Sequence, residues 1–276
     1  MPEEKFPFRM AFLAEYDGTD FVGFQRQNNG RSVQQELEKV LSVLYGCPVS
    51  VCGCSRTDSG VHARGHVSHV DVPFMIPPEK LPLAMNALLP EDVTVLASVQ
   101  VPDTFHARFH SAGKKYVYRI WNAPIRPTMD RHYLAHVPGN LNLEAMRDAA
   151  RILEGEHDYS AFFAQDGRDV NPVRKMDEIQ ILSEAGSPII EIVVRGKSFL
   201  YNMVRILAGT LVYVGQGKLD LLAVEEALTG GDRRAAGKTM PAKGLTLEKV
   251  YYEPDLFYQI EGKTSTFTSF KKNRII

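Results

Sequence analysis

The clearest strand of the chain reads Lys115-Tyr-Val-Tyr-Arg-Ile-Trp121. Its alternation places Tyr116, Tyr118 and Ile120 on one face and Val117, Arg119 and Trp121 on the other, as a β-strand requires. Several predicted strands neighbour one another in sequence, and strands and helices do not alternate regularly. This order favours an α+β fold in which a mainly antiparallel sheet has helices packed on one face.

Hydrophobic patterning and local start and stop signals place the other elements. A helix begins after Ser32, which with Gln35 forms a capping box, and ends at Gly46. The loop at 122–127 is a plausible crossing between two halves, 1–110 and 111–256, and 257–276 reads as a flexible tail. Strands are predicted at about 10–16, 49–54, 66–72, 93–101, 178–182, 189–194 and 245–252, and helices at 143–153, 199–214 and from Asp220 to Gly230, with a short one ending before Pro90.

Composition and charge describe an ordinary globular protein. The chain has 276 residues, of which 44% are hydrophobic, so a core can form without disulfide or metal. Lys and Arg number 32 against 33 Asp and Glu, which argues against a polybasic binder but allows a local basic stripe. The odd set Cys47, Cys52 and Cys54 is typical of reduced thiols, and we find neither a secretory signal nor a membrane span. We therefore expect a cytoplasmic location.

The densest group of reactive side chains is Cys52-Gly-Cys-Ser-Arg-Thr-Asp-Ser-Gly-Val-His-Ala-Arg-Gly-His66, between two predicted strands. Its one carboxylate, Asp58, lies near Arg56 in a glycine-containing loop. A neighbouring arginine lowers the pKa of an acid, and glycine allows a ligand to approach closely. The segment predicts a site with an ionised acid, although the same pattern also suits an aspartate that caps a turn beside an incidental arginine.

Two further segments carry candidate site residues. In the predicted helix 199–214, Arg205 lies on a small, polar face, from which it can either reach into a site or remain solvated. Lys114 and Lys115 precede the strand tyrosines, a combination that resembles a platform for bases and phosphates. Strand tyrosines are also commonly core residues, so spacing leaves both readings open.

Three other functions compete with an acid-based enzyme. A metal site is suggested by Cys52, Cys54, His62, His66 and His69, but their spacing fits no common structural zinc pattern. Gly237-Lys-Thr239 ends like a phosphate-binding loop, yet the preceding glycine is wrongly spaced and the segment follows a helix. A non-catalytic RNA-binding protein would need the basic and aromatic residues but not Asp58. Among acid-based enzymes, a hydrolase that uses a lone aspartate is a further alternative, although no second acid or nucleophile–base pair has a recognisable spacing.

Taken together, the motifs resemble the tRNA pseudouridine synthases of the TruA family along nearly the whole chain. Two positions depart from the family pattern: Ser55 stands where we expect glycine, and Asn202 where many members carry histidine. The matching segments are Glu15-Tyr-Asp-Gly-Thr-Asp-Phe-Val-Gly-Phe-Gln-Arg-Gln27, Arg31-Ser-Val-Gln34, Arg56-Thr-Asp-Ser-Gly-Val-His-Ala63, Asn86-Ala-Leu-Leu-Pro90, Phe105-His-Ala-Arg108, Lys115-Tyr-Val-Tyr-Arg119, Phe199-Leu-Tyr-Asn-Met-Val-Arg205 and Pro241-Ala-Lys-Gly-Leu245.

The resemblance implies two similar sheet-and-helix halves flanking a central active-site cleft. It also implies an isomerase that converts uridine to pseudouridine at positions 38–40 of the tRNA anticodon arm, as a homodimer and without cofactor or metal. Asp58 would be the catalytic aspartate, Arg205 its ion-pair partner and Tyr116 the active-site tyrosine against the target base. Our candidates for contacts with RNA phosphates are cationic residues: Arg26, Arg56, Arg64, Arg108, Lys114 and Lys115.

Overall fold

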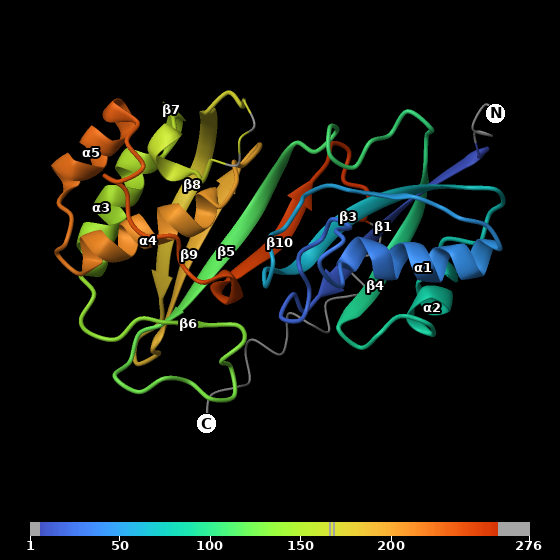
Figure 1. Cartoon of the computed structure of the whole chain (residues 1–276), viewed down its shortest axis with the longest axis horizontal. Coiled ribbons are helices and arrows are strands. Elements are labelled where there is room, and N and C mark those ends of the chain that lie inside the picture. The colour runs from blue at the N-terminus through green and yellow to red at the C-terminus, as the bar shows by residue number, and fades with distance from the viewer. Residues whose placement is uncertain (1–5, 166, 168, 259–276) are drawn as a thin grey trace.

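The computed structural model describes residues 6–165, 167 and 169–258. Within these residues one ten-stranded sheet runs through the whole molecule, in the order β4-β1-β3-β10-β5-β9-β8-β7, with β2 paired to β3 and β6 to β5 (Figure 1). The strands are β1 (Phe8–Tyr16), β2 (Val51–Gly53), β3 (His62–Val72), β4 (Val93–Val101), β5 (Gly113–Trp121), β6 (Ala135–His136), β7 (Gly155–Asp158), β8 (Val173–Ser183), β9 (Ile189–Gly196) and β10 (Leu245–Tyr251).

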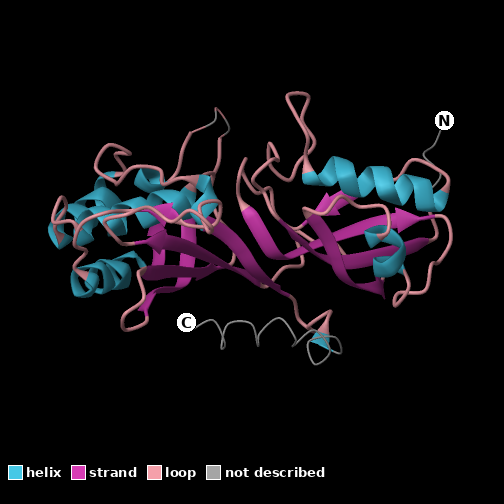
Figure 2. Ribbon diagram, turned by 90° about the horizontal axis from the view of Figure 1, so that it is seen from below, coloured by secondary structure: helices cyan, strands magenta, loops and turns pink. Residues whose placement is uncertain are grey.

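The α-helices cover one face of the sheet in two groups, one over each half (Figure 2). In the first half, Leu37 and Leu41 of α1 and Phe12 of β1 belong to the hydrophobic core and are fully buried. No helix of the described ranges is long and apolar enough to cross a membrane. The helices are α1 (Val33–Tyr45), α2 (Leu81–Asn86), α3 (Leu143–Leu153), α4 (Met203–Gly215) and α5 (Leu221–Gly230). The α+β prediction, with two halves and helices on one face, is confirmed.

Strand β10 joins the two halves into one sheet. It pairs in parallel with β3, where Thr246 lies opposite His62, and antiparallel with β5, where Leu247 lies opposite Tyr116. The loop that enters β3 and the tyrosine face of β5 are therefore separated by one strand. Neighbouring strands lie about 4.8 Å apart, so this pairing brings Asp58 and Tyr116 to one site.

Most predicted elements are present, but several boundaries differ: β8 begins at Val173 rather than at about 178, and β6 was not predicted. Ser32 caps α1 by accepting a hydrogen bond from the Gln35 amide. Helix α4 begins at Met203 rather than 199, because Asn202 has φ of 58°, in the left-handed region. Strand β3 begins earlier than predicted, at His62, and β7 was not predicted. Phe257, at the start of the predicted tail, is buried, and 259–276 lie outside the described residues.

The segment 237–240 packs directly against the backbone of α4. A Cβ atom on Gly209 would lie 1.8 Å from the Lys238 carbonyl oxygen, and one on Gly237 would lie 2.4 Å from the Thr210 nitrogen. The Gly237 amide donates to Thr210 Oγ1 over 2.9 Å. Glycine is thus needed here for close packing of two backbones. This accounts for Gly237-Lys-Thr239 without a phosphate-binding loop.

We predict that Gly209→Ala destabilises the protein by about 1–3 kcal/mol or more, because the added methyl group overlaps a backbone carbonyl. Gly230→Ala is the matched control: it also lies in a helix, and nothing lies within 4 Å of its Cβ position. This control should be neutral or stabilise by about 0.5–1 kcal/mol. Urea unfolding measures both, and equal midpoints for the two variants would contradict the packing interpretation.

Candidate active site

A cavity of about 760 Å³ lies where the two halves meet. The loop before β3, the segment after β1, strand β5 and the residues that begin α4 all line it. Asp58 and Tyr116, which are far apart in the sequence, face this one space. Its lining residues include Val22, Gln25, Arg26, Gln27, Asn29, Ser55, Arg56, Thr57, Asp58, Arg108, Lys114, Tyr116, Phe199, Tyr201, Asn202 and Met203.

The loop that carries Asp58 is held by backbone hydrogen bonds to the segment after β1. The Phe24 amide donates to the Thr57 carbonyl over 3.1 Å, and the Gly60 amide donates to the Phe21 carbonyl over 3.3 Å. Gly23 bridges to Asp58 with φ of 119°, and a Cβ there would lie 2.7 Å from the Thr57 carbonyl oxygen. This position therefore needs glycine both for its conformation and for the close approach.

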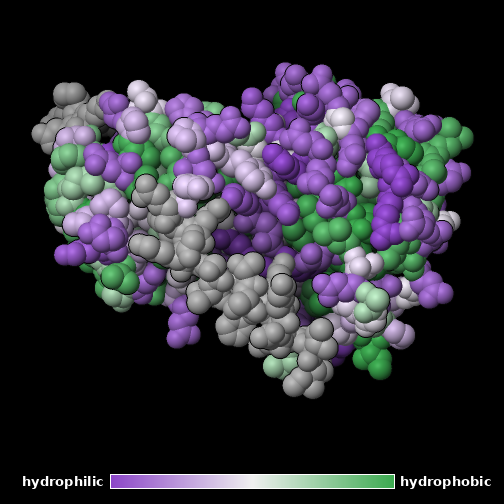
Figure 3. Space-filling view, turned by 180° about the vertical axis from the view of Figure 1, so that it is seen from behind, coloured by the Kyte–Doolittle hydropathy of each residue, from purple (hydrophilic) through white to green (hydrophobic). Residues whose placement is uncertain are grey.

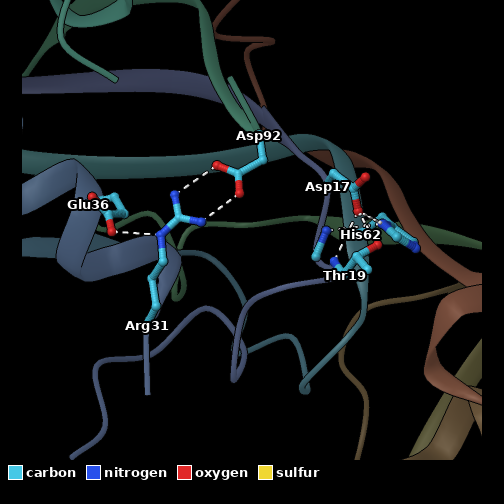
Figure 4. Close-up of polar contacts among 7 residues, drawn as sticks. Asp17, Thr19, Arg31, Glu36, His62 and Asp92 are labelled. Atoms are coloured by element: carbon cyan, nitrogen blue, oxygen red, sulfur yellow. Dashed lines mark hydrogen bonds and ion pairs between the residues drawn. The ribbon is translucent and has the colours of Figure 1, made fainter. Parts of the chain in front are cut away.

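Arg31, Glu36 and Asp92 form a second group of side chains that supports the segment after β1 (Figure 4). None of the three lines the cavity. Arg31 donates two hydrogen bonds to Asp92, at 2.6 and 2.9 Å, and a third to Glu36 at 2.8 Å. The guanidinium also lies 4.3 Å from the centre of the Phe21 ring. Bidentate arginine–carboxylate pairs are geometrically specific. Arg31 thus fixes Phe21, whose carbonyl receives the Gly60 amide of the Asp58 loop.

Asp58 and Arg205 form an ion pair across the two halves. Arg205 Nη1 lies 3.3 Å from Asp58 Oδ2, and 17% and 21% of the two side chains are exposed. The guanidinium also donates to Asn202 Oδ1 over 2.6 Å and to the Met240 carbonyl over 2.7 Å. Three acceptors therefore hold Arg205 in place. The left-handed conformation of Asn202 sets one of them, a role that the sequence did not indicate.

Burial raises the pKa of the Asp58 carboxyl above its ordinary value, and Arg205 opposes the rise without cancelling it. The local sequence pattern around Asp58 attributed this opposing charge to Arg56, which is wrong, whereas the family resemblance named Arg205 as the ion-pair partner. Arg56 is exposed, and the cation that lowers the pKa comes from α4. A raised pKa in a cavity is a feature of functional acids, because it brings the proton equilibrium closer to neutral pH.

Tyr116 forms part of the cavity wall beside the loop. Its hydroxyl lies 2.9 Å from Ser55 Oγ, and its ring packs edge-on against Phe199, with 5.0 Å between the ring centres. Burial raises the pKa of the phenol well above its usual value, so the hydroxyl stays protonated at neutral pH. The site therefore presents a neutral phenol next to a paired carboxylate.

The candidate cations divide between the two faces of the sheet. Arg26, Arg56, Arg108 and Lys114 line the cavity. Lys114 is buried, and its ammonium donates to the Cys54 carbonyl over 2.8 Å. By strand alternation Lys115 shares the other face of β5 with Arg119, which pairs with Glu248.

Arg64 lies 3.6 Å from the same Glu248 carboxylate. Figure 3 shows the molecule from behind, where hydrophilic side chains near the centre lie beside a hydrophobic area. Neither Arg64 nor Lys115 is among the residues that line the cavity with Asp58.

The cysteines and histidines considered for a metal site separate in space. His66 Nε2 lies 3.0 Å from the Ser55 carbonyl oxygen, and His62 Nε2 lies 2.9 Å from that of His132. Cys52 and His69 instead meet His106, which sequence spacing did not single out. Their ligand atoms lie within 4.8 Å of one another, and Cys52 Sγ is 3.6 Å from His106 Nε2.

Hydrogen bonds at the two rings disfavour a metal in this cluster. The Ala107 amide donates to His69 Nδ1 and the Arg108 amide to His106 Nδ1, each over 3.2 Å. Both Nδ1 atoms are then acceptors, so a neutral ring carries its hydrogen on Nε2. Metal-bound histidines show the reverse arrangement, in which the non-ligating nitrogen donates its hydrogen. The contacts fit a hydrogen-bonded cluster.

Comparison with known proteins gives consistent matches over most of the chain. A family model described as tRNA pseudouridine synthase matches residues 12–110 and 149–253. The tRNA pseudouridine synthase A of Ruminiclostridium cellulolyticum is 46% identical over 244 residues, which cover 88% of this chain and 99% of that protein. The protein of the same name from Geobacillus kaustophilus is 41% identical over 248 residues, covering 90% and 95%. A chain in the crystal structure of a Cbf5-Nop10-Gar1 complex also aligns with this protein. The alignment covers 91% of this chain and 56% of the matched chain, at 13% sequence identity and a TM-score of 0.35.

We predict that Arg205→Met raises the pKa of Asp58 further, because Arg205 is the charge that opposes the effect of burial. Carboxyl ¹³C NMR, with the Asp58 signal assigned through Asp58→Asn, measures this pKa directly. Arg56→Met is the matched control, since Arg56 is close in sequence but is not the ion-pair partner. An Asp58 pKa that moves with Arg56 and not with Arg205 would contradict the assignment.

Proposed function

The chain belongs to the tRNA pseudouridine synthase family, and on this premise we propose that it isomerises uridine to pseudouridine in tRNA with Asp58 as the catalytic carboxylate. The observation that supports the site assignment is the buried pair of Asp58 and Arg205 beside Tyr116 in one cavity. We propose that Arg205 holds the carboxylate ionised and that Tyr116 lies against the target base.

The chemistry requires few groups. The N1–C1′ glycosidic bond breaks, the base turns, and a bond forms from C1′ to C5. The hydrogen on C5 leaves as a proton and N1 gains a proton, so there is no net oxidation or reduction. Asp58 supplies a carboxylate, and Arg205 engages its Oδ2 so that the charge survives burial. A uridine within a stem or loop must leave its stack to be reached. A cavity of about 760 Å³ has room for a nucleoside, and the Tyr116 ring offers a wall for the base.

The buried carboxylate favours an enzyme over a binding module on the same scaffold. RNA is a polyanion, and a negative charge in the middle of a cationic cavity opposes phosphate binding. Burying that charge also costs free energy, which Arg205 only partly offsets. A protein that merely held RNA would gain by replacing Asp58 with a neutral residue.

We predict that wild-type protein releases tritium from tRNA labelled at uracil C5, without added cofactor, and that Asp58→Asn abolishes the release while it still binds tRNA. The matched control is Asp20→Asn, which alters an exposed carboxylate in the supporting loop and should keep activity. Release by Asp58→Asn at the wild-type rate would contradict our choice of catalytic residue. Binding by both proteins with no release from either would support the non-catalytic alternative.

We further propose that the target lies in the anticodon arm, at positions 38–40, and that the protein works in the cytoplasm as a homodimer. The near-zero net charge supports a shared surface, because two chains can combine local basic patches that a single chain lacks. In this proposal the halves 1–110 and 111–256 supply Asp58 and the pair Tyr116 and Arg205, respectively.

Salt dependence tests the RNA contacts. We expect Arg26→Gln, Arg56→Gln and Arg108→Gln each to weaken tRNA binding and to reduce the slope of log K against log salt by about 1, because these cations line the cavity. Arg64→Gln and Lys115→Gln are matched controls outside the cavity and should leave the slope unchanged. Sedimentation over a salt series measures both slope and stoichiometry, with two chains per complex expected. The proposal would be contradicted if Arg64→Gln and Lys115→Gln reduced the salt slope while the three cavity variants did not. The RNA would then bind on the other face of the sheet.

A further inference from the structure

The side chain of Ser55 contacts Tyr116, the tyrosine of the site. Its Oγ lies 2.9 Å from the Tyr116 hydroxyl, and the two residues are 61 positions apart in the chain. Both line the cavity that holds Asp58. We propose that Ser55 is a positioning residue that directs the Tyr116 hydroxyl in the site, an inference that rests on the proposed function.

The backbone around Ser55 is fixed from two sides. His66 donates from Nε2 to the Ser55 carbonyl over 3.0 Å, and Lys114 donates to the carbonyl of Cys54 over 2.8 Å. His66 is buried and stacks on Phe24 with 4.0 Å between ring centres. Burial lowers the pKa of His66 to about 4, so its ring stays neutral and keeps one tautomer near pH 7. The backbone that carries the Ser55 side chain is therefore held in place beside Tyr116.

The phenol has one hydrogen, and in the proposed arrangement Tyr116 donates it to Ser55 Oγ, which lies 2.9 Å away. Phe199 packs against the ring of Tyr116 and restricts its tilt, but it cannot orient a hydroxyl. Besides burial, the negative charge of Asp58 contributes to the raised pKa of the Tyr116 phenol, so this carboxylate acts on the phenol electrostatically. A hydrogen bond with Ser55 holds the phenol away from that carboxylate. Asp58 then keeps Arg205 as its partner and stays available to the nucleotide.

Loss of the Ser55 hydroxyl should affect turnover more than tRNA binding. A neutral hydrogen bond in a protein contributes a modest free energy, so we expect Ser55→Ala to lower kcat about three- to tenfold. KM for tRNA should stay unchanged, because Ser55 contacts Tyr116 rather than a phosphate. Ser55→Thr retains the hydroxyl and should restore most of the rate.

A double-mutant cycle separates this positioning role from general damage to the loop. In a Tyr116→Phe background, Ser55→Ala should have no further effect on single-turnover tritium release, because the partner hydroxyl is already gone. Ser98→Ala is the matched control, since it removes another buried hydroxyl, bonded to the Pro78 carbonyl far from the cavity. It should leave kcat unchanged. Additive effects of Ser55→Ala and Tyr116→Phe would overturn the proposal.

A second readout does not depend on activity. In protein labelled with ¹³C at the tyrosine Cζ, with the Tyr116 signal assigned through Tyr116→Phe, Ser55→Ala should shift that signal and Ser98→Ala should not. An unmoved Tyr116 signal would overturn the proposal even if catalysis changed. A shifted signal in a protein that releases no tritium would support the contact and contradict the proposed function, so the two failures are distinguishable.

Discussion

The pairing of β10 with both β3 and β5 is the constraint on which the site depends. Backbone hydrogen bonds across this strand make one sheet from two halves, parallel on one side and antiparallel on the other. The chain that leads into β10 also serves the site directly. The Met240 carbonyl accepts from Arg205, and the Pro241 carbonyl accepts from Tyr118 over 2.8 Å. The same short segment thus aligns the strands and fixes the arginine.

The Asp58 loop is part of the first half, but both halves act on it. Its backbone is held by residues after β1, whereas the charge that pairs with its carboxylate comes from α4. A rigid sheet lies beneath both, which allows a loop to carry chemistry without being mobile. Burial raises the pKa of Asp58 and Arg205 lowers it, so the proton equilibrium depends on how closely the two halves pack. A small change in the packing between the two halves would therefore alter the pKa of Asp58.

Local patterns predicted most of the elements because their causes are local. The strand at 93–101 and the helix at 143–153 have the predicted bounds, as alternation and helical spacing depend only on near neighbours. The helix at 199 begins late because one residue, Asn202, adopts a left-handed conformation to serve Arg205. Strand β7 has the sequence Gly-Glu-His-Asp and lies at the sheet edge, so it shows no hydrophobic pattern.

Local sequence patterns indicate some features of the site and give no sign of others. Alternation along β5 already places Lys115 on the face opposite Tyr116. Ser55, which stands where the family pattern has glycine, forms a hydrogen bond with Tyr116. Because the two residues are 61 positions apart, no local pattern indicated this contact. His106 lies 54 residues from Cys52, so no spacing rule related them.

The sequence by itself determined the order of strands and helices, the family resemblance and the identity of Asp58, Tyr116 and Arg205 as candidates. The resemblance had already implied that Arg205 pairs with Asp58, but only the tertiary structure showed the 3.3 Å contact between them and the burial that raises the pKa of this acid. The physical reason is range. Backbone preference and hydrophobic periodicity act over a few residues, whereas charge pairing and desolvation act through space between groups 147 positions apart in the chain.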